Sequence, residues 1–312
     1  MALTTRRRAL TAFGAALTGA FAQPGADAFA ATNVRPGAGA FGATSVRPGA
    51  GAFGAAVPAE RGKAPLWRAH AHNDYEHPRP LLDALDHRFG SVEADIHLVG
   101  GQLLVAHDPE DLDPARTLES LYLDPLVARV RTHHGWVYRG HHRPLQLLID
   151  IKTEGAATYL ELDRRLRRYK HLFTTYAHGR VFPGPVTAVV SGDRAARVPM
   201  EAQTVRHAFY DGRLSDLGSP APASFVPLIS DNWTRTFTWL GAGPFPDAER
   251  QRLHAITGAA HERGQTVRFW ATPDLSGPER DALWAELLAA GVDHLNTDDL
   301  AGLEAFLDAH GS

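Results

Sequence analysis

The stretch SVEADIHL, residues 91–98, separates polar from apolar side chains if it forms a β-strand. Side chains alternate along a strand, so one face carries Ser91, Glu93, Asp95 and His97, and the other face is wholly apolar. In a closed barrel the apolar face packs against outer helices, and the polar face points inward. Buried carboxylates cost free energy unless positive charge neutralises them. We therefore expect Glu93 and Asp95 to bind one hard divalent cation, Mg²⁺ or Ca²⁺.

A second stretch, LQLLIDIK at residues 145–152, repeats this arrangement. Asp150 and Lys152 lie at its carboxyl end, where barrel enzymes build their active sites. Asp150 is the expected third oxygen ligand, and Lys152 is expected to balance charge or bind a substrate phosphate. Two simpler interpretations remain open: a solvated edge strand for residues 91–98 and an isolated Asp–Lys ion pair for residues 145–152.

Short strand-like stretches alternate with amphipathic helical segments from Leu66 onward. This alternation predicts an α/β fold with a parallel sheet, and eight repeats favour a (β/α)8 TIM barrel. An open doubly wound sheet is the alternative, but it usually carries a glycine-rich loop after its first strand. The expected strands are residues 66–71, 91–98, 145–152, 186–191, 205–210, 225–230, 266–271 and 292–296. Residues 102–106 (QLLVA) are expected to form a hairpin with the second strand.

Histidines follow the first strand and the hairpin. The segment AHAHNDY ends the first strand with His70 and His72, and AHDP presents His107 next to Asp108. Two histidines can act as base and acid if one is neutral and the other protonated near neutral pH. We assign His72 as the base and His107 as the acid, although the sequence does not order them.

The bulk composition excludes several classes of protein. The 312 residues carry a net charge of −3, which gives no basic field for binding nucleic acid. The absence of cysteine excludes disulfides and thiolate metal sites. Outside the N-terminus no run of eighteen or more apolar residues predicts a transmembrane segment. The expected partner is a small-molecule or lipid substrate, and the oligomeric state stays open.

The N-terminal residues are typical of an exported protein. Residues 1–30 contain adjacent arginines, a weakly apolar stretch and small residues, as in a cleavable signal peptide. The arginines resemble a twin-arginine signal, and a general secretory signal is the alternative. A twelve-residue unit rich in Gly, Ala and Pro occurs twice, at 31–42 and 43–54. We expect residues 31–64 to be a disordered linker, residues 65–312 to be the catalytic barrel, and the protein to be secreted.

Together the motifs resemble the superfamily of glycerophosphodiester phosphodiesterases and phosphatidylinositol phospholipase C-like barrels. Its hallmarks are a histidine after the first strand, E-x-D on the second, H-D soon after, and acidic-x-Lys on the third. The segments HNDY, TLESLYLDPL and LLIDIKTEG are similar to the branch named altered inheritance of mitochondria protein 6. The resemblance extends from about residue 67 to about residue 307.

The resemblance implies a metal-dependent phosphoric diester hydrolase acting on a glycerophosphodiester, a phospholipid or a related phosphodiester. It also implies that Trp270, at the end of the seventh strand, lines the substrate pocket. Two departures leave the substrate open. Better-known glycerophosphodiesterases carry H-R-G where this chain has His72-Asn73-Asp74, and glutamate where it has Asp150.

Two other functions fit parts of the pattern. His70-Ala71-His72 is an H-x-H at the end of a first strand, as in amidohydrolase-type barrels. Those barrels bind zinc through further histidines, one of them on the fifth strand, where this chain has His207. A non-catalytic barrel that binds a phosphate ligand is the second alternative. Metal analysis distinguishes the first, and an assay on phosphodiesters distinguishes the second.

Overall fold

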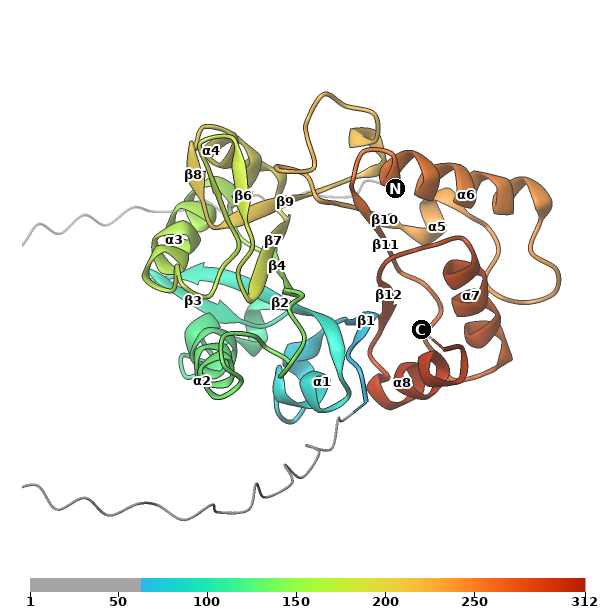
Figure 1. Ribbon diagram of the computed structural model, residues 1–312, viewed down its shortest axis with the longest axis horizontal. Helices are drawn as coiled ribbons and strands as arrows, with labels where there is room; N and C mark the ends of the chain where they lie inside the picture. Colours follow the sequence, from blue (N-terminus) through green and yellow to red (C-terminus); the bar gives the residue numbers. More distant parts are fainter. Residues whose placement is uncertain (1–62, 312) are drawn as a thin grey trace, which may run out of the picture. The chain divides into compact units, whose positions relative to one another are not determined.

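A computed structural model describes residues 63–311 of the protein. Eight parallel strands form the wall of a barrel, and helices surround them (Figure 1). In order around the wall they are β1 (Leu66–Ala71), β2 (Phe89–Val99), β4 (Leu145–Ile151), β7 (Val186–Gly192), β9 (Ala208–Gly212), β10 (Leu228–Asn232), β11 (Thr266–Trp270) and β12 (Leu295–Thr297). Between β11 and the segment before β12 the described residues form a single β-bridge, from Arg268 to His294, so the barrel is nearly closed. The TIM-like α/β architecture expected from the sequence is confirmed.

Helices follow most of the wall strands. They are α1 (Leu82–Asp86), α2 (Asp124–Thr132), α3 (Gly155–Arg168), α4 (Arg197–Glu201), α5 (Trp233–Thr236), α6 (Asp247–His261), α7 (Pro278–Ala289) and α8 (Leu300–Ala309). Short helical turns are η1 (Asp74–Glu76), η2 (Pro109–Asp111), η3 (Glu119–Leu123), η4 (Arg194–Ala196) and η5 (Leu214–Asp216). None of the helices in this part of the chain is long and apolar enough to cross a membrane.

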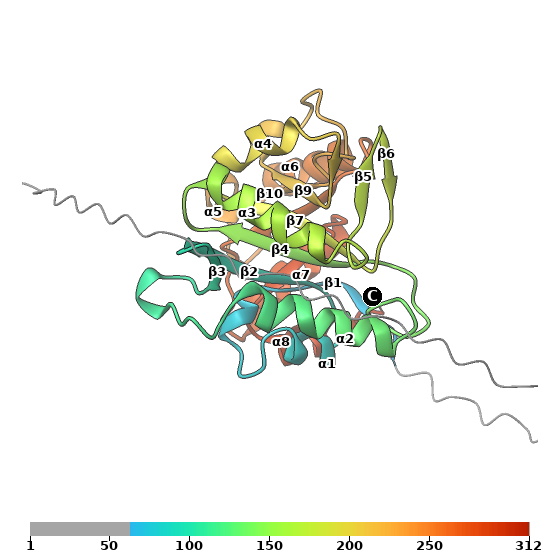
Figure 2. The same ribbon diagram turned by 90° about the vertical axis from the view of Figure 1, so that its left-hand side faces the viewer.

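Four strands lie outside the barrel wall at opposite ends of it (Figure 2). At the carboxyl end, β3 (Gln102–Val105) pairs antiparallel with β2, as the expected hairpin requires. At the amino end, β5 (Thr175–Ala177) pairs with β6 (Arg180–Phe182) and with β8 (Val205–Arg206).

Three expected strands begin three residues later than predicted. The stretch 292–296 is one of them, because β12 begins only at Leu295. The stretch 205–210 is divided, because Val205 and Arg206 pair with β5 before the chain enters the wall at Ala208. The stretch 225–230 becomes a strand only at Leu228. Pro227 precedes it and has no N–H to donate to a neighbouring strand, which explains the later start.

Alternation along the strands divides the core into two layers. Val92, Ala94 and Ile96 of β2 belong to the large apolar core that includes the helices. A smaller apolar cluster fills one half of the barrel interior and consists of Leu148, Val189, Phe209 and Leu228. These four residues come from β4, β7, β9 and β10. The interior beside β1, β2, β11 and β12 is polar instead, as the alternation in residues 91–98 predicts.

The motif after β4 has a structural role. Glu154 caps α3, because its carboxylate accepts hydrogen bonds from the amides of Ala156 (2.9 Å) and Ala157 (2.8 Å). At Gly155 an added Cβ would lie 2.6 Å from Asp193 Oδ1 and 2.7 Å from the amide of Ala196. The sequence TEG therefore lets α3 begin directly behind the strand that carries Asp150 and Lys152.

The expected export signal, residues 1–30, lies outside the described residues, as does the repeat linker except for its last two residues. Lys63 Nζ lies 2.8 Å from Asp308, and the carbonyl of Ala64 accepts a hydrogen bond from Arg88. These two residues therefore already contact the barrel domain.

Candidate active site

The structure brings Asp95, Asp150 and Lys152 together at the carboxyl end of β2 and β4. Asp95 and Asp150 are direct neighbours in the register of the two strands. The Nζ atom of Lys152 lies 2.9 Å from Asp95 Oδ2 and 2.8 Å from Asp150 Oδ2. Both carboxylates raise the pKa of Lys152, so it carries its charge at any ordinary pH. One cationic atom thus already bridges the two carboxylates.

Asp95 is the least neutralised of these groups. Its side chain is buried, and burial together with the negative charge of Glu93 raises its pKa to about 7 despite Lys152. The Oδ2 atom also lies 2.7 Å from the hydroxyl of Tyr75. The Oδ1 atom is buried and has no hydrogen-bond partner among the described residues. A buried carboxylate oxygen without a donor is costly, and a bound cation would satisfy it.

Glu93 lies deeper and is neutralised by the protein itself. Its Oε2 atom lies 2.7 Å from Arg268 Nη2 and 3.1 Å from His70 Nε2. Burial alone would raise its pKa, but the charge of Arg268 and the hydrogen bond from His70 lower it well below the ordinary value. Arg268 reaches Glu93 from β11, so both side chains point into the barrel, as expected for Glu93.

His70 is a structural histidine that links Glu93 to the polar interior. It is fully buried, and burial with the nearby charge of Arg268 lowers its pKa to about 3. A neutral ring with Nε2 next to a carboxylate donates from Nε2, so Nδ1 accepts from Ser91 Oγ at 2.7 Å. Gln146 Nε2 in turn donates to Ser91 Oγ at 2.9 Å. Both nitrogens of His70 are therefore used inside the fold.

The donor set suits a hard cation, although the side chains do not yet converge on one point. No group of three His, Asp or Glu residues between 63 and 311 is placed to hold a metal ion as the side chains lie. The reason is visible in the contacts, because Arg268 holds Glu93 and Lys152 lies between Asp95 and Asp150. Three carboxylates against these two cationic side chains leave one net negative charge. That charge and the unpartnered Asp95 oxygen fit a divalent cation with oxygen ligands.

His72 is held in place by a carboxylate that the sequence analysis did not identify. Its amide donates to the carbonyl of Thr297, and its Nδ1 lies 2.8 Å from Asp298 Oδ1. Burial opposes the charged ring, but the hydrogen bond to Asp298 and the charge of Glu93 raise the pKa of His72. Because Nδ1 donates to Asp298, Nε2 is the atom left to accept or release a proton.

Asp298 is itself positioned by Asp274. The Oδ2 atom of Asp274 accepts from the amide of Asp298 at 2.6 Å, and its Oδ1 accepts from Thr297 Oγ1 at 2.6 Å. Two motifs that lie far from His72 in the sequence, ATPD (271–274) and NTDD (296–299), therefore fix its orientation.

His107 lies on the rim beyond β3 and is half exposed. Its Nδ1 is 3.1 Å from Asp108 Oδ1, and its carbonyl accepts from His97 Nε2 at 3.1 Å. A pocket of about 500 Å³ is lined by His107, Tyr75, Arg116 and neighbouring residues. Among the described residues no hydrogen bond joins His107 to His72. Tyr75 connects this pocket to the carboxylates, since its hydroxyl reaches Asp95.

The turn after β1 explains the sequence HND. Asn73 adopts a left-handed conformation (φ 46°), which asparagine tolerates better than most residues. Asp74 is fully buried, and its Oδ2 accepts from the amide of Leu81 (2.6 Å) and the hydroxyl of Tyr122 (2.9 Å). Burial raises its pKa to about 7. Asp74 therefore stabilises the loop, which accounts for an acidic residue where H-R-G has glycine.

Trp270 ends β11 and is half-buried at the same rim. It is the register partner of Asn232, and the guanidinium of Arg235 lies 6.0 Å from its ring centroid. Its expected place in the substrate pocket stays a prediction.

Two residues that decide the charge balance, Arg268 and Asp298, were missed by sequence reasoning. For Arg268 a signal existed, because TVRFWA places it on the same strand face as Trp270. For Asp298 there was no comparable signal, since it follows its strand in a loop.

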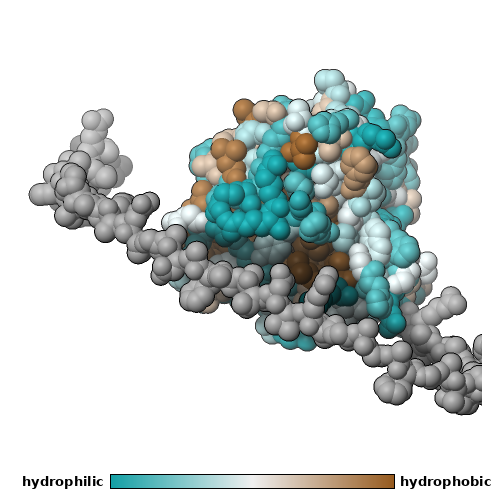
Figure 3. Space-filling model, turned by 60° about the vertical axis from the view of Figure 1, so that its left-hand side comes forward, coloured by the Kyte–Doolittle hydropathy of each residue, from teal (hydrophilic) through white to brown (hydrophobic). Residues whose placement is uncertain are grey.

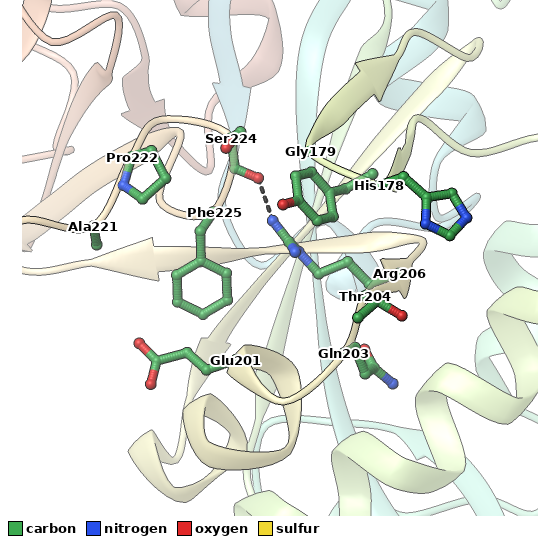
Figure 4. Close-up of a pocket in the computed structure, with 11 residues that line it drawn as sticks. His178, Gly179, Glu201, Gln203, Thr204, Arg206, Ala221, Pro222, Ser224 and Phe225 are labelled. Carbon is green, nitrogen blue, oxygen red and sulfur yellow. Dashed lines mark hydrogen bonds between the residues drawn. The ribbon is translucent and has the colours of Figure 1, made fainter.

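A separate pocket of about 460 Å³ lies at the amino end of the barrel (Figure 4). Arg206 lies at its centre, donates to the carbonyl of Ser224 and stacks between Tyr176 and Phe225. The pocket is formed by β5, β8 and the segment before β10, all on the amino side of the wall strands. It contains none of the carboxylates and histidines described above, so we do not assign the chemistry to it.

The geometry does not favour the amidohydrolase alternative. His207 precedes β9, at the amino end of the strand, near Arg167 and Asp163 of α3. His70 and His72 lie at the carboxyl end of β1. These histidines therefore do not share a site.

Comparisons with known proteins agree with this geometry. The sequence model of the AIM6-like phosphodiesterase domain matches residues 61–211, and that of the glycerophosphoryl diester phosphodiesterase family matches residues 266–301. Altered inheritance of mitochondria protein 6 of Eremothecium gossypii is 32% identical over 273 residues, covering 77% of this chain and 69% of that protein. The chain belongs to this family.

Other members are similar over the same part of the chain. The Arthroderma benhamiae homologue is 29% identical over 274 residues, covering 79% of this chain and 85% of that protein. The Saccharomyces cerevisiae protein is 25% identical over 272 residues, covering 74% and 68%. The stretch 61–211 contains His72, His107 and the three carboxylates, and the stretch 266–301 contains Arg268 and Asp298. The two matched stretches thus meet at one end of the barrel.

Proposed function

We propose that this chain is a metal-dependent phosphoric diester hydrolase that acts on a glycerophosphodiester, a phospholipid or a related phosphodiester. The observation that carries the proposal is the cluster at the carboxyl end of β2 and β4. There Lys152 bridges Asp95 and Asp150, and one buried oxygen of Asp95 has no partner among the described residues. The phosphodiesterase-type domain of the family supports the reaction class.

The cation is proposed to be one Mg²⁺ or Ca²⁺ held by Glu93, Asp95 and Asp150. When bound it supplies electrostatic stabilisation of the charge that develops on phosphate oxygens. Lys152 adds a second positive contact to the same phosphate and holds the two aspartates side by side. Trp270 is proposed to line the rim against the organic part of the substrate.

Proton transfer is proposed to belong to the two histidines. His72 Nε2 accepts the proton of the attacking hydroxyl, while Asp298 on Nδ1 stabilises the charged ring. His107 gives a proton to the leaving oxygen from its exposed position on the rim. The attacking hydroxyl belongs to water or to the substrate itself, and both routes use the same groups.

The decisive experiment is a panel of phosphodiesters assayed with Mg²⁺ and with Ca²⁺. The panel contains glycerophosphodiesters, lysophospholipids, sphingomyelin and phosphoinositides, and each assay is repeated in excess chelator. We expect turnover of at least one class with a divalent cation and none in chelator. Absence of turnover across the panel with both cations would contradict the proposal.

Variants of the two histidines test the roles within the reaction. His72→Asn and His107→Asn should each lower kcat by roughly 10²–10⁴-fold, the usual contribution of acid–base catalysis. Both side chains are partly exposed, so folding should be retained. Unchanged kcat in either variant would remove that residue from the mechanism.

Secretion is proposed on the sequence of residues 1–30 alone, which lie outside the described part of the chain. Fractionation of the native host with detection of the mature N-terminus tests it. A protein found in the cytoplasm with an intact N-terminus would contradict the proposal.

A further inference from the structure

Four arginines gather beside the candidate active site, on the helices and loops that follow β7, β9 and β10. They line a cavity of about 570 Å³ together with two aspartates and other residues. The charged residues of this arginine pocket are Arg194, Arg197, Arg213, Arg235, Asp216 and Asp231. Two carboxylates outside the lining also neutralise part of this charge, because Glu201 pairs with Arg197 and Asp211 pairs with Arg213. Five of them follow the carboxyl ends of their strands, and Asp231 is the second-last residue of β10, so all six lie at the end of the barrel that holds Asp95 and Asp150.

The two aspartates are already engaged. Asp216 accepts from Arg197 Nη1 at 2.8 Å, and the other nitrogen contact of Arg197 is with Glu201. Asp231 accepts hydrogen bonds from the backbone amides of Leu214 and Asn232. Asp216 is therefore paired with Arg197, whereas Asp231 is held by backbone amides and forms no ion pair among the described residues.

Arg194 and Arg235 carry the uncompensated charge. The Nη1 atom of Arg194 is buried and has no hydrogen-bond partner among the described residues. The nearest carboxylate is that of Asp216, whose Oδ2 lies 3.8 Å from Arg194 Nη2. Burial and the charge of Arg213 lower the pKa of Arg194, as expected for a crowded cation. Arg235 is exposed and makes no ion pair within residues 63–311; its guanidinium lies 6.0 Å from the ring of Trp270.

Arg213 connects this pocket to the candidate active site. It is three-quarters buried and lies 2.5 Å from Asp211 Oδ2, and its Nη2 donates to Ser191 Oγ at 3.2 Å. Ser191 is the register partner of Asp150 on the adjacent strand. The charge of Asp150 is also among those that raise the pKa of Arg213. A substrate phosphate at Asp150 and a second group in the arginine pocket would therefore be neighbours.

We propose that the arginine pocket is a subsite for a second anionic group of the substrate, a phosphomonoester carried on the headgroup of the phosphodiester. Among the described residues no carboxylate lies closer than 3.8 Å to Arg194, and Arg235 makes no ion pair. These two guanidinium groups are available to a phosphate, which guanidinium binds through paired hydrogen bonds. The substrate class is then a phosphodiester with an additional phosphate. This inference rests on the proposed function for the position of the scissile bond, whereas the anion site itself does not.

Binding of inorganic phosphate to the full chain in excess chelator tests the anion site without turnover. Calorimetry or ³¹P NMR would compare wild type with Arg235→Gln, Arg194→Gln, Lys152→Gln and the control Arg131→Gln, an exposed arginine on α2. We expect roughly 10-fold or greater weakening in each of the first two variants, the scale of a lost charge-assisted hydrogen bond. Arg131→Gln should bind as wild type does, and Lys152→Gln should bind phosphate more tightly than Arg194→Gln and Arg235→Gln do.

The outcomes separate the subsite from the proposed function. No phosphate binding, equal binding by all variants, or loss only in Lys152→Gln would overturn the subsite. Arg235 is exposed, so its variant remains informative if Arg194→Gln fails to fold.

A second arm compares a glycerophosphodiester with its headgroup-phosphorylated form. Arg235→Gln should raise KM about 10-fold for the phosphorylated form alone, and an equal change for both substrates would overturn the subsite. If neither substrate is cleaved, the proposed function fails while the binding result stands.

Discussion

Asp298→Asn tests whether the carboxylate at His72 Nδ1 has a catalytic consequence. The substitution keeps the size of the side chain and removes its charge from an atom 2.8 Å away. Asp298 is half exposed and His72 is 30% exposed, so solvent screening limits the ion pair to about 0–1 kcal/mol. On the Coulomb term alone, kcat would fall less than about tenfold. The variant also loses the carboxylate that orients His72 through its Nδ1–H. We therefore expect kcat to decrease by roughly 10–100-fold, less than in His72→Asn.

The pH dependence of Asp298→Asn gives an independent measurement. Asp298 raises the pKa of His72, so the limb of the kcat/KM profile that belongs to His72 should move to lower pH in the variant. The same pair affects stability. Because the folded-state pKa lies above the ordinary 6.5, the stabilisation is complete below that pH and is lost as pH rises through the folded-state value. The Tm difference between wild type and variant should therefore be larger at pH 5.5 than at pH 9.

The chain offers a matched control for this experiment. Asp293 lies 2.8 Å from His261 Nε2, in a similarly exposed pair before β12 and away from the carboxyl ends of the strands. Asp293→Asn should leave kcat and its pH profile unchanged. Equal kcat and identical pH limbs in wild type and Asp298→Asn would refute the positioning role of Asp298, as would an equal loss of activity in both variants.

Three other predictions follow from the same contacts. Asp95→Asn should raise Tm at pH 8 in excess chelator, because the raised pKa of about 7 means that the ionised Asp95 destabilises the fold and the variant lacks that charge. The same variant should abolish the Tm increase that Mg²⁺ or Ca²⁺ produces. A lower Tm with the cation response retained would contradict both statements. His70→Asn should destabilise the fold by about 1–3 kcal/mol in denaturant titrations, because Ser91 and Glu93 each lose a buried partner, and an unchanged midpoint would contradict this. Deletion of residues 1–60 should leave Tm and activity unchanged, since the contacts of Lys63 and Ala64 are retained, and loss of folding would show that the removed segment is structural.

Local alternation was sufficient to predict the wall of the barrel and the direction of its polar face. In residues 91–98 the period of two fixes which side chains share a face, and closure of the sheet fixes which face is buried. Two of the three strands with wrong bounds fail for local reasons. Pro227 delays β10, and Arg206 pairs with an outer strand before β9 begins.

The neutralising partners could not be predicted in the same way. We expected a bound cation to balance Glu93 and Asp95, but Arg268 lies 175 residues beyond Glu93 and pairs with it directly. Asp298 reaches His72 across 226 residues. Such contacts depend on which strands become neighbours when the barrel closes. Periodicity within a single strand contains no information about that closure.

The division of the barrel interior explains why the chemistry is confined to one sector of the mouth. On β4, β7, β9 and β10 the barrel interior is filled by Leu148, Val189, Phe209 and Leu228. On these strands only the inward-pointing residues at the carboxyl ends are therefore polar. Under β1, β2 and β11 the polar groups continue downward, and Arg268 holds Glu93 from below. Glu93 is therefore already neutralised within the fold, whereas Asp95 depends on Lys152 and on what binds beside it. Of the two carboxylates on β2, Asp95 is thus the one whose charge state a bound cation or phosphate would change most.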